Sequence, residues 1–229
     1  MMKTIGIIGG LGPETSSKFY LEVILKSFQQ NPIARPPILM WSVPIDYDVE
    51  SDFINGSDRS KEYVALMVDA AQRLQAGGAD FIVIPCNSVH IFINEVRSAV
   101  TIPVLSIIEV TIAFLKVQII SKVGLLATTA SLQANLYQQP FAEEKITAIV
   151  PGAEDQSKMG VLINKLVREE YSDAQKEELL QIISHMANDV NVILLACTDL
   201  QLLAPSFEGV TIFDTMEILV GTTVEKALS

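Results

Sequence analysis

The sequence contains two cysteines, and each lies at the end of a short apolar run. Residues 82–88 read IVIPCNS around Cys86, and residues 192–199 read VILLACTD around Cys197. Runs of this kind are typical of buried parallel strands. Polar residues that end such strands lie at the carboxyl edge of the sheet, where open α/β folds bind their ligands. Two thiols on either side of a small molecule would suit removal of a proton from one face of a carbon and its return to the other.

Two further strand-like segments recur in the same order as the cysteine segments. Residues 4–10 (TIGIIGG) resemble residues 122–128 (KVGLLAT), and residues 103–109 (PVLSIIE) resemble residues 211–217 (TIFDTME). Three units in register indicate an internal duplication. We therefore predict two similar α/β halves, residues 1–115 and residues 116–214, with a C-terminal helix over residues 215–229 that joins the first half.

The composition excludes several classes of function. With a net charge of -11 and a pI near 4.6, the chain is not expected to bind nucleic acid or an anionic membrane surface. The longest apolar stretch, around residues 107–127, is interrupted by Glu109, Lys116 and Lys122, so no membrane span is predicted. Glycines over residues 9–12 end the apolar N-terminal stretch before a signal-peptide core forms. We expect a cytoplasmic protein that keeps both cysteines as thiols.

Strand and helix patterns alternate along the whole chain, which predicts parallel sheets covered by helices on both faces. A helix is expected to open at Pro13, and residues 46–58 are interpreted as a polar loop. The other predicted strands and helices are listed here by range. Strands are expected at residues 4–8, 36–43, 82–86, 104–106, 123–126, 147–150, 192–197 and 211–213, and helices at residues 59–75, 89–100, 107–120, 132–141, from 159, and 173–188.

The glycine-rich segment at residues 6–12 (GIIGGLG) follows the first predicted strand. It does not have G-x-G-x-x-G spacing, and no acid ends a second strand about 20 residues on, so it does not predict a dinucleotide site. It also lacks the Lys of a phosphate loop. A tight packing turn is the simplest interpretation. The functional alternative is a lid over a small carboxylate, formed by Gly10, Leu11 and Gly12.

The other polar motifs also have two interpretations each. Inert buried thiols are the commoner fate of single cysteines, but the matched positions favour a shared role. Two cysteines and two histidines without a paired ligand motif do not make a zinc site, so no metal is expected. His90, four residues after Cys86, is expected to cap or pack its helix. Thr128 and Ser131 either start a helix or hold a carboxylate through their hydroxyls and amides.

Four motifs stand in the order and spacing of the aspartate/glutamate racemase family. They are GGLGPET at residues 9–15, PCNSVH at 85–90, LLATTAS at 125–131 and ACTDL at 196–200. The chain resembles most the aspartate racemases that use no pyridoxal phosphate. The resemblance implies two flavodoxin-like parallel-sheet halves related by a pseudo-twofold axis, with the active site in the cleft between them. It also implies an isomerase that needs no cofactor, acts on a small amino acid and forms a homodimer.

The resemblance implies roles for individual residues as well. Cys197 would act on the L-enantiomer and Cys86 on the D-enantiomer. An α-proton is very weakly acidic, so a thiolate base needs a dry site and preorganised donors for the carboxylate. Helix N-termini, which are expected after both cysteines, lower thiol pKa values. The positions that hold the α-carboxylate and α-amino groups are matched by Asn87, Ser88, Thr128 and Thr198. The predicted substrate-binding set is Gly10, Leu11, Gly12, Asn87, Ser88, Thr128, Ser131, Arg168, Thr198 and Asp199.

Two departures from the family pattern concern the substrate. The aspartate racemases carry an Arg after the second strand that pairs with the side-chain carboxylate, whereas residues 44–49 here read PIDYDV. Arg59 lies further along, and Arg168 matches the family's later basic residue. The second motif has Asp199 where Glu is usual. If Asp46 and the neighbouring acid at residue 48 line the pocket, a neutral or basic substrate side chain is favoured.

We interpret the sequence as an amino-acid racemase with two cysteines that interconverts L- and D-aspartate. Racemisation of glutamate or another amino acid is an alternative. So is a same-fold isomerase or decarboxylase of small dicarboxylic acids, which would use one cysteine. A non-catalytic amino-acid-binding protein would need neither thiol. The presence of both cysteines in motif favours the first hypothesis.

Overall fold

The computed structural model describes residues 2–229, which form two compact units. The first unit contains the chain up to Asp46, Arg59–Val110 and Met216–Ser229. The second contains Tyr47–Asp58 and Thr111–Thr215. These bounds differ from the ranges predicted from the sequence mainly at Tyr47–Asp58, which was assigned to the first half. This segment packs in the second unit because its side chains bond to a helix far along the chain.

The first unit is built on three parallel strands, β1 (Ile5–Gly9), β2 (Ile38–Ser42) and β3 (Phe81–Val83), in the order β2-β1-β3. A single bridge from Ile82 to Val104 adds a fourth position beside β3. Every residue of β1 is buried, as expected for a central strand covered on both faces.

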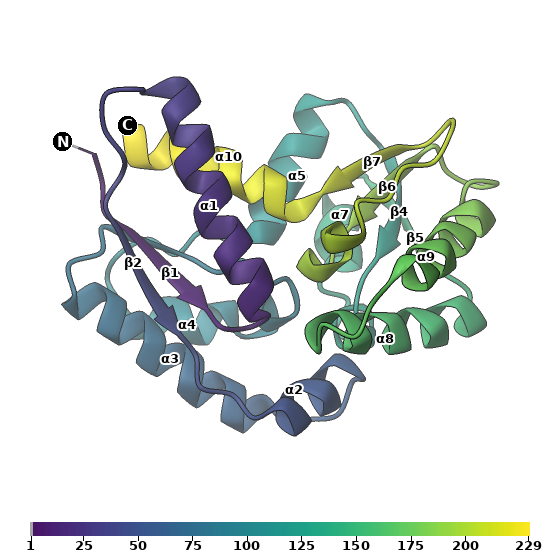
Figure 1. Ribbon diagram of the computed structural model, residues 1–229, viewed down its shortest axis with the longest axis horizontal. Helices are drawn as coiled ribbons and strands as arrows, with labels where there is room; N and C mark the ends of the chain where they lie inside the picture. The colour runs from purple at the N-terminus through teal and green to yellow at the C-terminus, as the bar shows by residue number, and fades with distance from the viewer. Residues whose placement is uncertain (1) are drawn as a thin grey trace. The chain divides into compact units, whose positions relative to one another are not determined.

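The strand order of the first unit determines which face of the sheet each connecting helix covers (Figure 1). The connections from β1 to β2 and from β2 to β3 run in opposite directions across the sheet. Because such crossovers are right-handed, α1 and α3 cover opposite faces. Pro13 opens α1 with Glu14 beside it, as predicted. The helices are α1 (Pro13–Gln30), α3 (Ser60–Ala76), η1 (Ser88–Phe92) and α4 (Ile93–Ala99), with most of α10 (Thr215–Leu228) and the start of α5 (Ile107–Val117).

The second unit repeats this topology with four parallel strands in the order β5-β4-β6-β7. The strands are β4 (Lys122–Leu126), β5 (Thr147–Ile149), β6 (Val192–Leu195) and β7 (Thr211–Asp214). Thus β4 corresponds to β1, β5 to β2, β6 to β3, and β7 to the bridged position at Val104. The predicted α/β fold with two similar parallel sheets is confirmed.

The helices of the second unit are α2 (Tyr47–Ile54), the remainder of α5 from Thr111, α6 (Thr129–Gln133), α7 (Gln138–Glu143), α8 (Ala153–Val167), α9 (Asp173–Met186) and η2 (Thr198–Leu203). The apolar faces of α8, α9 and η2 share one buried cluster, to which Leu166, Ile183 and Leu200 contribute. A capping box starts α9, where the Ser172 amide donates to Gln175 Oε1 at 2.9 Å. None of the helices formed by residues 2–229 combines the length and apolar character needed to cross a bilayer.

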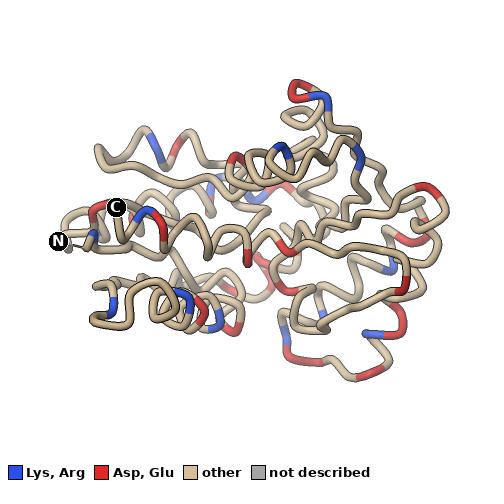
Figure 2. Tube along the Cα trace, turned by 90° about the horizontal axis from the view of Figure 1, so that it is seen from above, with Lys and Arg blue, Asp and Glu red and all other residues tan. Residues whose placement is uncertain are grey.

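Figure 2 marks the charged residues along the chain trace. Few of them belong to the described strands. Within them, charge occurs at Lys122, the first residue of β4, and at Asp214, the last residue of β7. The central strands β1, β3, β4 and β6 are almost entirely buried, and a charge inside them would lose its hydration.

The structure differs from several predicted elements. The polar segment 46–58 contains α2, whose Ser51 hydroxyl donates to Asn164 Oδ1 of α8 at 2.8 Å. The helix predicted at 132–141 is divided into α6 and α7, because Asn135 has a left-handed backbone with φ 52°. The strand predicted at 104–106 is a single bridge, since the chain enters α5 directly after it.

Candidate active site

The candidate residues of the first unit lie at the carboxyl edge of its sheet. The Gly10–Gly12 turn follows β1, and Cys86 follows β3. These two strands are hydrogen-bonded neighbours at the point where the strand order reverses. Open α/β sheets bind ligands in the crevice at such a switch point. The topology therefore brings these two predicted groups together within the unit.

Hydrogen bonds to Ser16 fix the glycine turn. The Gly10 amide donates to Ser16 Oγ at 3.0 Å, and the Ser16 hydroxyl donates to the Gly12 carbonyl at 2.9 Å. Gly10 and Gly12 have φ of 83° and 85°, while Leu11 is buried. Only glycine adopts this backbone without strain, so the packing interpretation of the turn is sound. Its role over a carboxylate stays a prediction.

We expect Gly10→Ala to destabilise the first unit strongly. An added Cβ would lie 2.7 Å from the Val43 nitrogen and 2.9 Å from the Val43 oxygen. The left-handed backbone costs about 1–2 kcal/mol with any side chain, and overpacking adds roughly 1–3 kcal/mol. Gly209→Ala is the matched control, because Gly209 has φ 75° and open space around it. Urea unfolding should show the larger loss at Gly10; equal losses would rule out the clash with Val43.

Cys86 is half-buried, and the two residues that follow it are buried. Asn87 is the N-cap of η1, and Ser88 is its first residue. The structure therefore places the predicted PCNS motif at a strand-to-helix junction, as expected. Whether Asn87 and Ser88 bind substrate stays a prediction.

His90 has a larger role than the capping or packing predicted from the sequence. Its Nδ1 lies 2.8 Å from the Cys86 carbonyl oxygen, and its Nε2 accepts a hydrogen bond from the Ile107 amide at 3.1 Å. Since Nε2 accepts, Nδ1 carries the proton and donates to Cys86. Burial lowers the pKa of His90 to about 4. The charged groups that act on it are Arg97 and Glu109, which form an ion pair at 2.8 Å.

The burial of His90 predicts a loss of stability in mild acid. The unfolded imidazole titrates near 6.5 and the native one near 4, so between these values the unfolded chain binds an extra proton. The free energy of unfolding should fall by roughly 3 kcal/mol as the pH drops from 6.5 to 4. Urea titrations across this range should show a shallower fall in His90→Asn, because the carboxylates titrate in both proteins. Identical slopes would contradict a buried neutral imidazole.

In the second unit, the corresponding edge carries Thr128 and Ser131 after β4. Thr128 is the N-cap of α6: its Oγ1 accepts from the Ser131 amide at 3.2 Å and donates to Ser131 Oγ at 2.9 Å. Of the two interpretations, the structure therefore shows these hydroxyls at the start of a helix. Gln156 was not predicted as a site residue, since no motif contains it. Its Nε2 donates to the Ala127 carbonyl at 3.1 Å and holds the end of β4.

Cys197 lies two residues after the end of β6, the strand next to β4, at the same edge of the sheet. The Ala196 amide donates to the Leu126 carbonyl at 2.8 Å, which ties the two strand ends together. The Cys197 side chain is buried, and its Sγ donates to Asp199 Oδ2 at 3.6 Å. Asp199 and Thr198 are also buried, in η2. A carboxylate within hydrogen-bond reach of the thiol can exchange its proton.

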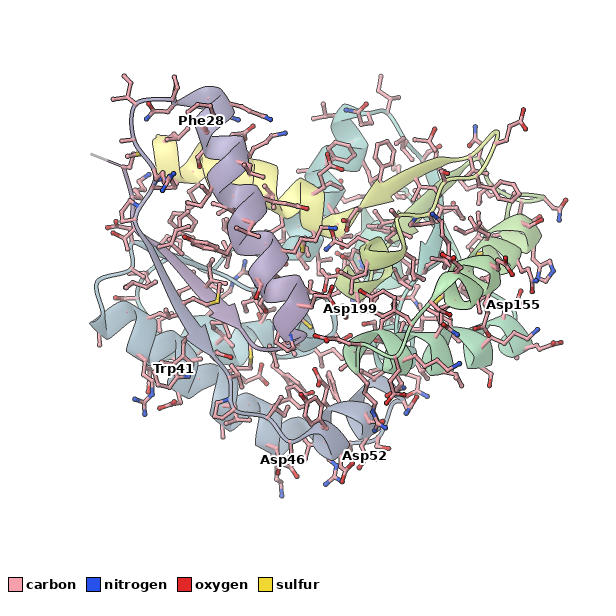
Figure 3. All side chains as sticks on the ribbon, in the orientation of Figure 1. Phe28, Trp41, Asp46, Asp52, Asp155 and Asp199 are labelled. Atoms are coloured by element: carbon pink, nitrogen blue, oxygen red, sulfur yellow. The ribbon has the colours of Figure 1, made fainter. Side chains whose placement is uncertain are left out.

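The residues expected to set substrate specificity are more exposed. Arg168 is exposed at the C-cap of α8, a helix that packs against η2. In Figure 3, the label Asp155 marks the first turn of α8 and the label Asp199 marks η2, so these two packed elements can be located there. Asp46 is exposed, and Arg59 pairs with Glu62 at 3.5 Å.

The described residues contain no metal site, and they form a depression away from the cysteines. Within residues 2–229, no three His, Cys, Asp or Glu side chains gather as a metal site. A depression of about 480 Å³ in the second unit is lined by Lys122, Asp189 and Glu208, among others. It lies at the amino end of β4, at the opposite edge of the sheet from Cys197, so it does not belong to the candidate site.

The fold and the matched thiols define a duplicated α/β protein with one cysteine at the carboxyl edge of each sheet. The sequence profile of the Asp/Glu/hydantoin racemases matches residues 8–223, so the chain belongs to that family. The family predicted from four motifs is thereby confirmed, and the class of activity is racemisation, an isomerase reaction.

Individual relatives cover nearly the whole chain. The chain is 25% identical over 230 residues to the broad specificity amino-acid racemase RacX of Bacillus subtilis (strain 168), with 98% of both covered. An aspartate racemase of Picrophilus torridus has a similar structure, with TM-score 0.83, 23% identity, and 98% and 94% covered. An aspartate racemase homologue of Pyrococcus horikoshii OT3 has TM-score 0.77 and 24% identity, with 100% of both chains covered. These two structural similarities support the fold assignment and nothing beyond it.

Proposed function

We propose that the protein is an amino-acid racemase that uses Cys86 and Cys197 as its two acid–base groups and needs no cofactor. The observation that carries this proposal is the matched placement of the thiols. Each follows the strand that pairs with the first strand of its unit, at the carboxyl edge of the sheet. Neither cysteine is engaged in a disulfide in the described chain.

The proton balance of this reaction closes without a further reagent. One cysteine, as thiolate, takes the α-proton of an amino acid and becomes a thiol. The other cysteine, as thiol, gives its proton to the opposite face of the carbon and becomes a thiolate. The reverse reaction exchanges the roles, so no net proton is consumed. Buried hydroxyl and amide groups next to each thiol, at Ser88 and Thr198, support binding of the substrate carboxylate.

Incubation with each L-amino acid, followed by chiral chromatography, tests the proposed function. We expect the D-enantiomer to accumulate, and activity to persist in a chelator and in a carbonyl reagent. Binding of an amino acid without interconversion would favour the non-catalytic alternative. Inhibition by the chelator, with recovery on adding a metal, would contradict the cofactor-independent mechanism.

For the substrate, we propose aspartate, with Arg168 as the cation for its side-chain carboxylate. This rests on the packing of α8 against η2, the element that carries Thr198 and Asp199. Broad specificity is the alternative. It is favoured by the absence of an Arg from residues 44–49 and by the full-length similarity to a broad specificity racemase.

Replacement of Arg168 separates these two substrate assignments. A charged hydrogen bond to a carboxylate is worth roughly 1.5–3 kcal/mol, on the order of a ten- to hundredfold preference. Arg168→Ala should lose that factor on aspartate and little on alanine. Lys165→Ala, one turn earlier on α8, is the matched control. Steady-state rates on aspartate, glutamate, alanine and lysine decide the question: equal loss on all four, or none, removes Arg168 from the specificity pocket.

We further propose a homodimer in the cytoplasm. The dimer is supported by the family resemblance, and the compartment by the two cysteines that remain thiols. Light scattering of the purified protein measures the mass directly. A monomer at all concentrations would contradict the proposed dimer.

A further inference from the structure

The carbonyl oxygen of each cysteine is held, but by different groups in the two units. In the second unit, η2 begins directly after Cys197, which is its N-cap. The Leu200 amide donates to the Cys197 carbonyl at 3.1 Å, as the first bond of that helix. The backbone itself therefore fixes the peptide that carries the Cys197 side chain.

In the first unit, η1 begins two residues after Cys86, whereas η2 begins one residue after Cys197. Its N-cap is Asn87, and its first bond runs from the His90 amide to the Asn87 carbonyl at 3.0 Å. This shift removes the Cys86 carbonyl from the helical ladder. The side chain of His90 restores the lost bond, because Nδ1 lies 2.8 Å from the Cys86 oxygen.

The second ring nitrogen of His90 connects this peptide to another element. Nε2 accepts from the Ile107 amide, which opens α5 and has no partner inside that helix. The ring is 2% exposed, so water does not compete for either bond. Because both nitrogens are engaged with backbone, neither is available to exchange a proton with a substrate.

We propose that His90 is a positioning residue for Cys86: as the neutral Nδ1–H tautomer, it replaces the missing helical bond and fixes the Cys86 peptide against the start of α5. The inference uses the proposed function only in taking Cys86 as a catalytic thiol. The spacing of four residues between the two side chains suggests an acid–base pair, but the geometry assigns His90 to the backbone.

Two near-isosteric variants separate the two bonds of His90. In His90→Asn, the amide nitrogen occupies the place of Nδ1 and keeps the donor to Cys86. In His90→Gln, the amide oxygen occupies the place of Nε2 and keeps the acceptor for Ile107. The probe is iodoacetamide, with alkylation of Cys86 and Cys197 followed separately by peptide mass spectrometry across pH 6–10.

We expect His90→Gln to change the Cys86 alkylation rate by roughly three- to tenfold, the effect of one neutral hydrogen bond. His90→Asn should stay near wild type, and Cys197 is the internal reference in every sample. His185→Gln is the control, since His185 is exposed and pairs with Asp155 at 2.8 Å. Equal effects of the two His90 variants on Cys86, or equal effects on both thiols, would overturn the proposal.

The wild-type protein provides a second test that does not depend on any variant's folding. It contains two histidines, so ¹⁵N–¹H spectra of the imidazoles show two patterns, which His185→Gln assigns. We expect the Nδ1–H tautomer for His90 at pH 7, whereas an Nε2–H tautomer or an imidazolium would overturn the assignment. Neither readout needs racemase activity, so failure of the proposed function and failure of this inference are distinguishable.

Discussion

Replacing either cysteine with alanine should abolish racemisation. Cys86→Ala and Cys197→Ala each leave one face of the α-carbon without an acid or base, and we expect losses on the order of 10³-fold or more. The two losses should not add in the double variant, because the thiols act as one unit. Chiral chromatography with aspartate measures the interconversion, and circular dichroism checks that each variant folds.

Exchange of the α-proton in D₂O separates the roles of the two thiols. Cys86→Ala retains Cys197, so we expect slow exchange of the α-proton from L-aspartate with retention of configuration. Cys197→Ala should show the same for D-aspartate. The reversed pattern would exchange the assignment of the thiols to enantiomers. Near-full racemisation by either single variant would disprove the two-base mechanism.

The positions of most strands and of both cysteines could be predicted from the sequence, because local patterns determine them. Buried parallel strands produce apolar runs, and the residue that ends each run lies at the carboxyl edge whatever the rest of the chain does. The capping role of Thr128 is equally local, since its partner is three residues away. The duplication was visible for the same reason: three strand ends recur in order.

Other features depend on contacts distant in the sequence. The α2 helix is held by Asn164, more than a hundred residues away, so its polar composition alone predicted a loop. The bridging role of His90 depends on Ile107, which the fold brings next to it after a helix and a turn. The one-residue difference between the starts of η1 and η2 is also invisible in the motifs, although it determines which group holds each cysteine carbonyl.

The thiol contact of Asp199 changes the role expected for this residue. The sequence predicts that Asp199 binds substrate, but Cys197 Sγ donates to its carboxylate at 3.6 Å. We propose that Asp199 accepts the Cys197 proton before L-aspartate is deprotonated, which leaves Cys197 as the thiolate base, while the carbon receives its new proton from Cys86. Asp199→Asn keeps the size of the side chain and removes the basic oxygen, so kcat should fall about 10²-fold or more with little change in KM.

Asp199→Glu is the matched control for this prediction. Glu keeps the carboxylate and is the usual family residue, so this variant should retain most of the wild-type kcat. A purely substrate-binding role predicts the opposite division, with a raised KM and a preserved kcat in Asp199→Asn. Steady-state kinetics in both directions, started from L- and from D-aspartate, distinguish the two roles. If Asp199→Asn and Asp199→Glu lower kcat equally, the proton-accepting role is wrong. The Asp199 side chain, which is buried in η2, would then act through packing.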